Sequence, residues 1–114
     1  TNEAKVTLTL SANLNRYFAA QNAHDAEGMV TCFAPDAQVL DEGRDYSGRD
    51  EILEWKKDTI AKYGMSIQPL RQTEEGDTTT IVARVAGNFP GSPAELNYAF
   101  GLRDDGLIQT LRVG

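Results

Sequence analysis

Residues 16–41 read RYFAAQNAHDAEGMVTCFAPDAQVLD, and this stretch decides the fold class. It joins a helix that carries Tyr17 to a short strand that ends in Asp41. From about Thr7 to Asn22, apolar residues recur at three- and four-residue spacing, which predicts a helix with the Tyr17 ring pointing inward. A buried phenol that faces a partly buried carboxylate suits proton transfer.

The part of this stretch after the first helix predicts a second helix and a strand. Asp25 is a plausible N-cap of a short helix, which Pro35-Asp36 would end. We expect that helix to carry Met29, Val30 and Phe33. Ala37 to Asp41 then form a strand, and alternation places Val39 and Asp41 on the same face.

Outward from Asp41, the chain predicts a turn-rich segment and a third helix. The turn-rich segment runs from Glu42 to Tyr46. Ser47 and Asp50 have the spacing of a capping box, and Gly64 closes the helix that follows. Its apolar side is expected to carry Ile52, Trp55, Thr59, Ile60 and Tyr63.

The rest of the chain predicts four strands. Their expected ranges are Met65 to Thr73, Thr78 to Ala86, Ala94 to Leu102, and Leu107 to Val113. Residues 75–77 and 104–106 supply hairpin turns, whereas Gly87 to Pro93 form a longer connection. Three helices followed by an antiparallel sheet predict an α+β fold.

Length and composition limit the classes of function. At 114 residues the chain is expected to form one domain, residues 1–114. A net charge of −6 and scattered basic residues argue against a nucleic-acid partner. The apolar runs are too short to cross a bilayer, so we predict a cytoplasmic protein with no membrane partner. The single cysteine, Cys32, is interpreted as a packed thiol.

Two residues are candidates for acid–base chemistry, and each has a structural alternative. Asp41 could serve as a general base, because its apolar neighbours limit water while the next loop keeps it reachable. The alternative is that Asp41 merely opens that loop. The Tyr17 hydroxyl could donate to a developing oxyanion, or Tyr17 could be a core tyrosine whose hydroxyl bonds to backbone. No histidine-based triad or metal-ligand spacing accompanies them, so no metal is expected.

The same stretch resembles the start of the delta-five-3-ketosteroid isomerases and SnoaL-like cyclases, enzymes of the nuclear-transport-factor-like fold. The shared order is tyrosine (Tyr17), Asn-Ala-x-Asp (22–25), Phe-Ala-x-Asp-Ala (33–37) and a base aspartate (Asp41). The resemblance implies a cone-shaped, strongly curved antiparallel sheet wrapped by three N-terminal helices, in the cystatin-like manner. It also implies an active site inside the cone, with Asp41 as the base and Tyr17 as an oxyanion donor.

The resemblance breaks down at the second hydrogen-bond donor to the oxyanion, which the ketosteroid isomerases have in addition to the tyrosine. Ketosteroid isomerases use a protonated aspartic acid there, whereas the aligned position in this chain is Tyr98. Tyr98 could still donate a hydrogen bond, or it could be an ordinary aromatic residue on a half-buried sheet. The missing aspartate argues against steroid isomerase activity. Trp55 falls where the family has an aromatic residue in its third helix. It could line a pocket wall or simply pack in the core.

These observations predict a cofactor-independent isomerase or cyclase. It would act on a small apolar carbonyl compound by Asp-mediated proton transfer through an enolate. The alternatives are a non-catalytic module that holds a hydrophobic ligand or a protein partner, and a hydratase or epoxide-hydrolase-like enzyme. We expect substrate-lining roles for Trp55, Val39, Phe33, Leu96, Phe100 and Phe89. A homodimer is also expected, because the four strands offer more apolar surface than three short helices can cover.

Overall fold

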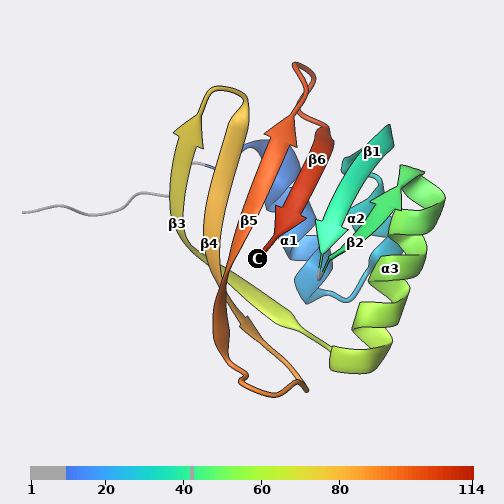
Figure 1. Ribbon diagram of the computed structural model, residues 1–114, viewed down its shortest axis with the longest axis vertical. Coiled ribbons are helices and arrows are strands. Elements are labelled where there is room, and N and C mark those ends of the chain that lie inside the picture. The colour runs from blue at the N-terminus through green and yellow to red at the C-terminus, as the bar shows by residue number, and fades with distance from the viewer. Residues whose placement is uncertain (1–9, 42) are drawn as a thin grey trace, which may run out of the picture.

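The computed structural model describes residues 10–41 and 43–114. Figure 1 shows a curled, open sheet with helices on one side of it. The predicted α+β class is therefore confirmed. In chain order, the described elements are α1 (Ala12–Asn22), α2 (Ala26–Val30), β1 (Phe33–Asp41), β2 (Arg44–Ser47), α3 (Gly48–Tyr63), β3 (Ser66–Glu75), β4 (Thr78–Ala86), β5 (Ala94–Leu102) and β6 (Ile108–Val113).

The six strands are ordered β2-β1-β6-β5-β4-β3 across the sheet. Neighbouring strands are antiparallel except β1 and β6, which run parallel. This pair corrects the expectation of a wholly antiparallel sheet. A parallel pair needs a long crossover connection, and here the connection contains β2, α3 and the β3–β5 meander. In Figure 1, α1 and α2 lie behind the sheet and α3 runs along its β2 edge.

The largest differences from the sequence-based prediction lie between residues 30 and 47. The second helix ends at Val30, so Phe33 and Pro35 belong to β1. Proline has no backbone N–H, and the pairing of β1 with β6 shifts register between Phe33 and Gln38. Residues 44–46, predicted as part of a turn, and Ser47, predicted as a helix cap, instead form β2, which pairs antiparallel with β1. Their polar sequence gives little strand signal.

Two asparagines fix α1 so that Tyr17 faces the interior between them. Near one end, Asn13 Nδ2 donates to the Cys32 and Gly106 carbonyl oxygens, both at 2.9 Å. At the other end, Asn22 accepts from the Ile67 N–H at 2.7 Å and donates to the Ile67 carbonyl at 3.0 Å. The helix begins at Ala12 rather than near Thr7, and residues 7–9 lie outside the described residues.

The start of α3 also differs from its prediction. The Ser47 side chain makes no capping hydrogen bond; instead, Glu51 Oε1 accepts from the Ser47 N–H at 2.8 Å. The expected Ser47–Asp50 box is therefore replaced by a single contact one residue further along the helix. Gly64 ends α3 in the left-handed conformation, as predicted, with φ at 54°. None of the described helices is both long enough and apolar enough to cross a membrane.

Candidate functional site

Tyr17 is fully buried, and its ring packs against three other aromatic rings. Its centroid lies 5.4 Å from that of Phe18, 5.7 Å from Phe33 and 5.6 Å from Phe100, all edge to face. Such pairs stabilise the packing beyond simple burial of area. The predicted inward orientation of the ring is confirmed, and the interior beside this ring is filled by side chains.

The Tyr17 hydroxyl is held by a buried lysine. Lys56 of α3 is only 3% exposed, and its Nζ donates to Tyr17 Oη at 2.5 Å and to Gln21 Oε1 at 3.3 Å. The same Nζ lies 4.0 Å from the centroid of the Trp55 ring and 4.8 Å from that of Tyr17. Aromatic faces attract a cation at such distances, so they offset part of the cost of burying the ammonium.

Asp41 joins this cluster at the end of β1. Asp41 lies on the same face of β1 as buried Ala37 and Val39, as predicted, and it is half-buried. Asp41 Oδ2 accepts a hydrogen bond from Trp55 Nε1 at 3.1 Å. The strand that carries the carboxylate and the helix that carries the lysine are thereby joined at the site.

Burial and the Asp41 charge set the protonation of the neighbouring groups. Burial lowers the pKa of Lys56 to about 7, although the Asp41 carboxylate opposes that shift. Burial also raises the pKa of Tyr17 well above its ordinary value, with smaller contributions from Tyr98, Cys32 and Asp41. At neutral pH the phenol is therefore an uncharged donor beside an amine that exists in both protonation states.

Tyr98 lies on the same inner face of the sheet, on β5. Its ring stacks on Phe100 at 6.2 Å and meets Phe18 edge-on at 6.4 Å. The side chain is 6% exposed, and its hydroxyl makes no hydrogen bond within residues 10–41 and 43–114. Burial, followed by the Asp41 charge, raises the pKa of Tyr98. A buried hydroxyl without a protein partner can donate to a ligand.

The other residues expected to line a pocket fall into two groups. Val39, Phe33 and Phe100 are almost completely buried in the core, and the latter two contact the Tyr17 ring. Leu96 and Phe89 are only partly buried. Phe89 packs against Tyr63 at the end of α3, with 6.0 Å between ring centroids. The core group thus surrounds Tyr17, whereas Phe89 lies by the end of α3.

Sequence reasoning missed Lys56. The signal was its spacing, because Lys56 lies four residues after Ile52 and four before Ile60, on the apolar side of α3. A lysine on such a stripe is ordinarily taken to extend its charged end to solvent. Gln21, which also contacts Lys56, lies four residues after Tyr17 and is therefore on the same side of α1.

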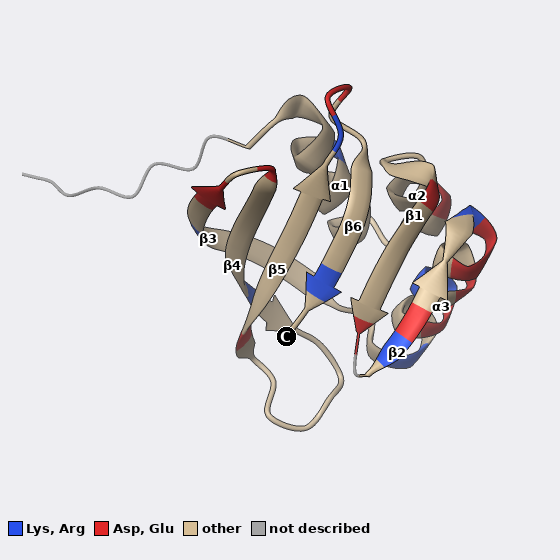
Figure 2. Ribbon diagram, turned by 45° about the horizontal axis from the view of Figure 1, so that its top comes forward, with Lys and Arg blue, Asp and Glu red and all other residues tan. Residues whose placement is uncertain are grey.

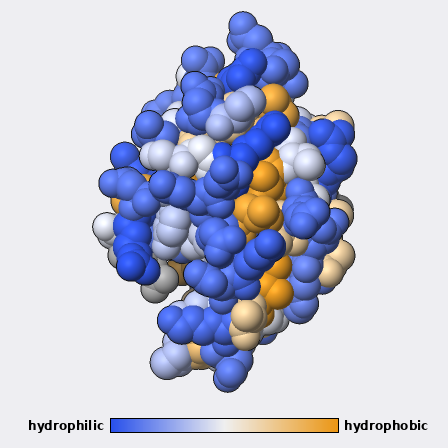
Figure 3. Space-filling model, turned by 90° about the vertical axis from the view of Figure 1, so that its right-hand side faces the viewer, coloured by the Kyte–Doolittle hydropathy of each residue, from blue (hydrophilic) through white to orange (hydrophobic). Residues whose placement is uncertain are grey.

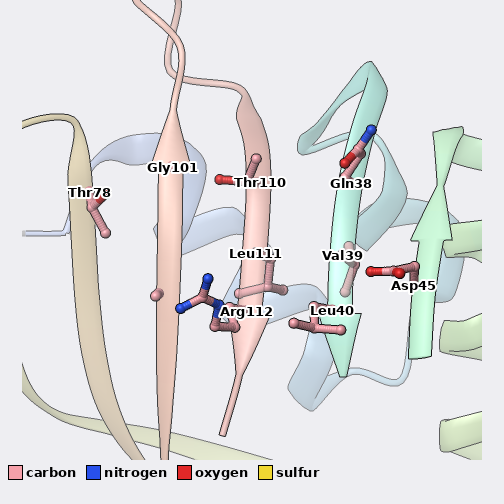
Figure 4. Close-up of a pocket in the computed structure, with 10 residues that line it drawn as sticks. Gln38, Val39, Leu40, Asp45, Thr78, Gly101, Thr110, Leu111 and Arg112 are labelled. Carbon is pink, nitrogen blue, oxygen red and sulfur yellow. The ribbon is translucent and has the colours of Figure 1, made fainter. Parts of the chain in front are cut away.

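One surface groove crosses the face of the sheet away from α1 and α2. It has a volume of about 360 Å³ and is lined by residues of β1, β2, β4, β5 and β6. Figure 4 shows polar side chains around it, including Gln38, Asp45, Thr110 and Arg112. Val39, Leu40, Ala99 and Leu111 also line it, so the lining is mixed rather than the apolar pocket that the sequence predicted. The Tyr17 cluster lies on the opposite face.

A second, open cleft lies between β2 and α3, with a volume of about 460 Å³. Trp55 and Tyr46 line it, and their rings stack at 5.4 Å between centroids. Its charged lining residues are Arg44, Asp45, Asp50, Glu51, Glu54 and Asp58. Figure 2 shows the acidic residues of α3 on this side of the molecule. Figure 3, which views the molecule from the α3 side, shows a narrow hydrophobic stripe between hydrophilic side chains; the residues that line the cleft are not part of it, because none of them is hydrophobic on that scale.

Metal and thiol chemistry gain no support from the described residues. Among residues 10–41 and 43–114, no group of three or more histidine, cysteine, aspartate or glutamate side chains could hold a metal ion. Cys32 is completely buried, and burial raises the pKa of its thiol. This agrees with the interpretation of Cys32 as a packed side chain.

Comparisons with known proteins agree with this architecture. The family model for the SnoaL-like domain matches residues 14–109. A proposed polyketide cyclase from Sinorhizobium meliloti is 37% identical, with a TM-score of 0.87 over 92% of this chain and 95% of that one. A search among curated proteins returned no match.

More distant structures show the fold alone. A protein of ketosteroid isomerase-like fold from Catenulispora acidiphila, solved with trimethylamine, is 23% identical, with a TM-score of 0.80 over 93% of this chain and 86% of that one. The epoxide hydrolase/cyclase-like enzyme SalBIII, of polyether salinomycin pyran-ring formation, is 19% identical, with a TM-score of 0.77 over 89% of this chain and 85% of that one. Together these hits support the nuclear-transport-factor-like fold.

Proposed function

The chain belongs to the SnoaL-like family, and from that premise we propose that it is a cofactor-independent isomerase or cyclase. Its substrate would be a small, largely apolar carbonyl compound. Asp41 would remove a proton from the carbon next to the carbonyl, leaving an enolate. In an isomerase the proton returns to another carbon; in a cyclase the enolate carbon attacks a second carbonyl of the same molecule.

One observation carries this proposal: Lys56 donates to Tyr17 Oη in the same cluster that contains the Asp41 carboxylate. Because Tyr17 Oη accepts from the ammonium, its own O–H remains available to donate elsewhere. The nearby positive charge strengthens that donation toward an enolate oxygen. Tyr98 would be the second donor, since its buried hydroxyl makes no hydrogen bond among the described residues.

Exchange of carbon-bound hydrogen tests the proposal without the natural substrate. A small cyclic ketone in D2O is followed by NMR with the wild-type protein, Asp41→Asn and Asp36→Asn. Asp36 is the matched control, because it is an exposed aspartate on the same strand. Asp41→Asn should lose at least about 100-fold in exchange rate, and Asp36→Asn should retain it. Equal rates in all three proteins would contradict the assignment of Asp41 as base.

The aromatic packing around Tyr17 supports a second candidate, a non-catalytic binding module. Three rings contact the Tyr17 ring, so the inner part of the cone has the density of a core. A module of this kind would hold a hydrophobic ligand or a protein partner with no proton transfer. Saturable binding of the ketone without any Asp41-dependent exchange would favour this candidate over the enzyme.

We also propose that the chain forms a homodimer. The outer sheet face is not uniformly apolar, because Gln38, Thr110 and Arg112 line its groove together with apolar residues. Light scattering over a dilution series should give about twice the chain mass of 12.5 kDa. A mass that stays at the monomer value throughout would exclude the dimer.

A further inference from the structure

The Lys56 amine has a chemical capacity that the proposed proton transfer leaves unused. Its Nζ has two hydrogen-bond acceptors among the described residues, Tyr17 Oη and Gln21 Oε1. A neutral amine has two N–H bonds and one lone pair. Both N–H bonds therefore have acceptors, and the lone pair is available for attack on carbon.

The surroundings of Lys56 favour that neutral form. The side chain is 3% exposed, so water hardly reaches its ammonium form, and the attraction of that cation to the Trp55 and Tyr17 ring faces offsets this cost only in part. The charged and titratable groups that act on it are Asp41 from β1 and Tyr17 from α1. Burial lowers the pKa of Lys56 to about 7, so both forms are populated at neutral pH. Lysines activated in this way by an apolar environment attack carbonyl compounds.

We propose that Lys56 is a covalent site, at which its amine condenses with the carbonyl carbon of a small, uncharged aldehyde or ketone to give an imine. The nitrogen lone pair forms the new C–N bond while the C=O π pair moves to oxygen. That oxygen is protonated, with the Tyr17 hydroxyl as the adjacent donor, and nitrogen loses a proton. Loss of water then gives C=N, with no change of oxidation state.

The acidic cleft identifies the class of carbonyl compound. Trp55 both lines the cleft and contacts the Lys56 amine, so its ring separates that amine from the solvent side. A compound that reaches Lys56 by this route passes five carboxylates and a single arginine. Anions are repelled by such a field, whereas uncharged carbonyl compounds are not. The expected reactants are therefore neutral aldehydes and ketones, and oxo acids are disfavoured.

Reductive trapping at pH 7 with benzaldehyde and 2-picoline borane, an uncharged reductant that the acidic cleft does not repel, tests the site. Benzaldehyde has no proton on the carbon next to its carbonyl, so the reaction is independent of Asp41-dependent exchange. Peptide mapping should find benzylation at Lys56 at least about tenfold faster than at exposed Lys57 and Lys62, since ordinary lysines are almost fully protonated at this pH. Lys57→Met should keep the fast label, and Lys56→Met should lose it, with circular dichroism verifying the fold of both.

Two further comparisons complete the test, one of a Trp55 variant with the wild type and one of two aldehydes on the wild type. Trp55→Ala should speed labelling of Lys56, because it removes the ring between the cleft and the amine. 4-Carboxybenzaldehyde should label more slowly than benzaldehyde. Labelling of Lys56 no faster than that of Lys57 and Lys62 would overturn the covalent site, and equal rates for the two aldehydes would overturn the substrate class. A failure of the proposed proton transfer would instead appear as Asp41-independent hydrogen exchange with Lys56 labelling intact.

Discussion

On one side of the Tyr17–Lys56 hydrogen bond lie the rings of Phe18, Phe33 and Phe100. On the other side the Trp55 ring contacts the amine and stacks on Tyr46, and both rings line an acidic cleft. We call these the inner side and the outer side. The inner side fixes where the phenol lies by dense packing. The outer side places carboxylates along the cleft that Trp55 lines. The lysine is tolerated at the boundary between the two sides because Tyr17 and Gln21 accept its hydrogen bonds and the Trp55 ring attracts its charge.

The largest effect is expected from a substitution that disrupts the packing of the inner side. Phe100→Ala should lower the free energy of unfolding by about 3 to 5 kcal/mol, because it leaves a cavity beside the Tyr17 ring. Glu54→Gln on the outer side should change it by less than about 0.5 kcal/mol, since that side chain is exposed. Urea unfolding measures both. Similar losses for the two variants would show that the two sides do not differ in this way.

The next effect concerns the boundary itself. Folding lowers the pKa of Lys56 from 10.5 to about 7, so between these values the unfolded chain binds more protons than the folded one. Stability should therefore rise with pH above 7, by about 2 to 3 kcal/mol from pH 7 to 9 relative to Lys56→Met. Subtracting that variant removes the contributions of the other titrating groups.

Urea unfolding at several pH values measures this difference. Well below pH 7, Lys56 is protonated in both the folded and the unfolded protein. The difference in free energy of unfolding between the wild type and Lys56→Met should therefore level off there. A difference that stays constant from pH 7 to 9 would mean that Lys56 keeps an ordinary pKa in the folded protein. The account of its burial would then be wrong.

A smaller effect is expected on the binding of an anion, to which the Tyr17 phenol and the Asp41 carboxylate should contribute with opposite sign. Tyr17→Phe should weaken binding of the 2-naphtholate anion by about 1 to 3 kcal/mol, because a hydrogen bond to a charged oxygen is lost. Asp41→Asn should strengthen it by removing a negative charge. Fluorescence titration across pH measures both, with Tyr63→Phe at the far end of α3 as the control. Unchanged affinity in both site variants would separate Tyr17 and Asp41 into different sites.

Much of the inner side could be predicted from the sequence. The stripe on the first helix gave the inward direction of Tyr17, and alternation gave the shared face of Val39 and Asp41. Both follow from local periodicity, which a single sequence shows. The αL end of α3 at Gly64 was predictable for the same reason, because a glycine after an apolar helical pattern is a strong stop signal.

The outer side could not be predicted, because it depends on pairing and packing partners that the local sequence pattern does not reveal. Arg44 to Ser47 form a strand only because β1 provides a pairing edge, and their own sequence is polar. Pro35 reads locally as a helix stop, yet the parallel partner β6 accommodates it in a register shift. Lys56 reads as a solvent-facing cation until Tyr17, Gln21 and Trp55 are seen around it.

The central position of β6 has a consequence for the order of assembly. Of the six described strands this one is synthesised after the other five, yet it lies between β1 and β5 and joins the two halves of the sheet. Until residues 108–113 have emerged from the ribosome, the β1–β2 hairpin and the β3–β5 meander have no shared strand. Asp41 and Tyr98 come from those separate halves, so the nascent chain can bring them together in one sheet only when β6 is inserted.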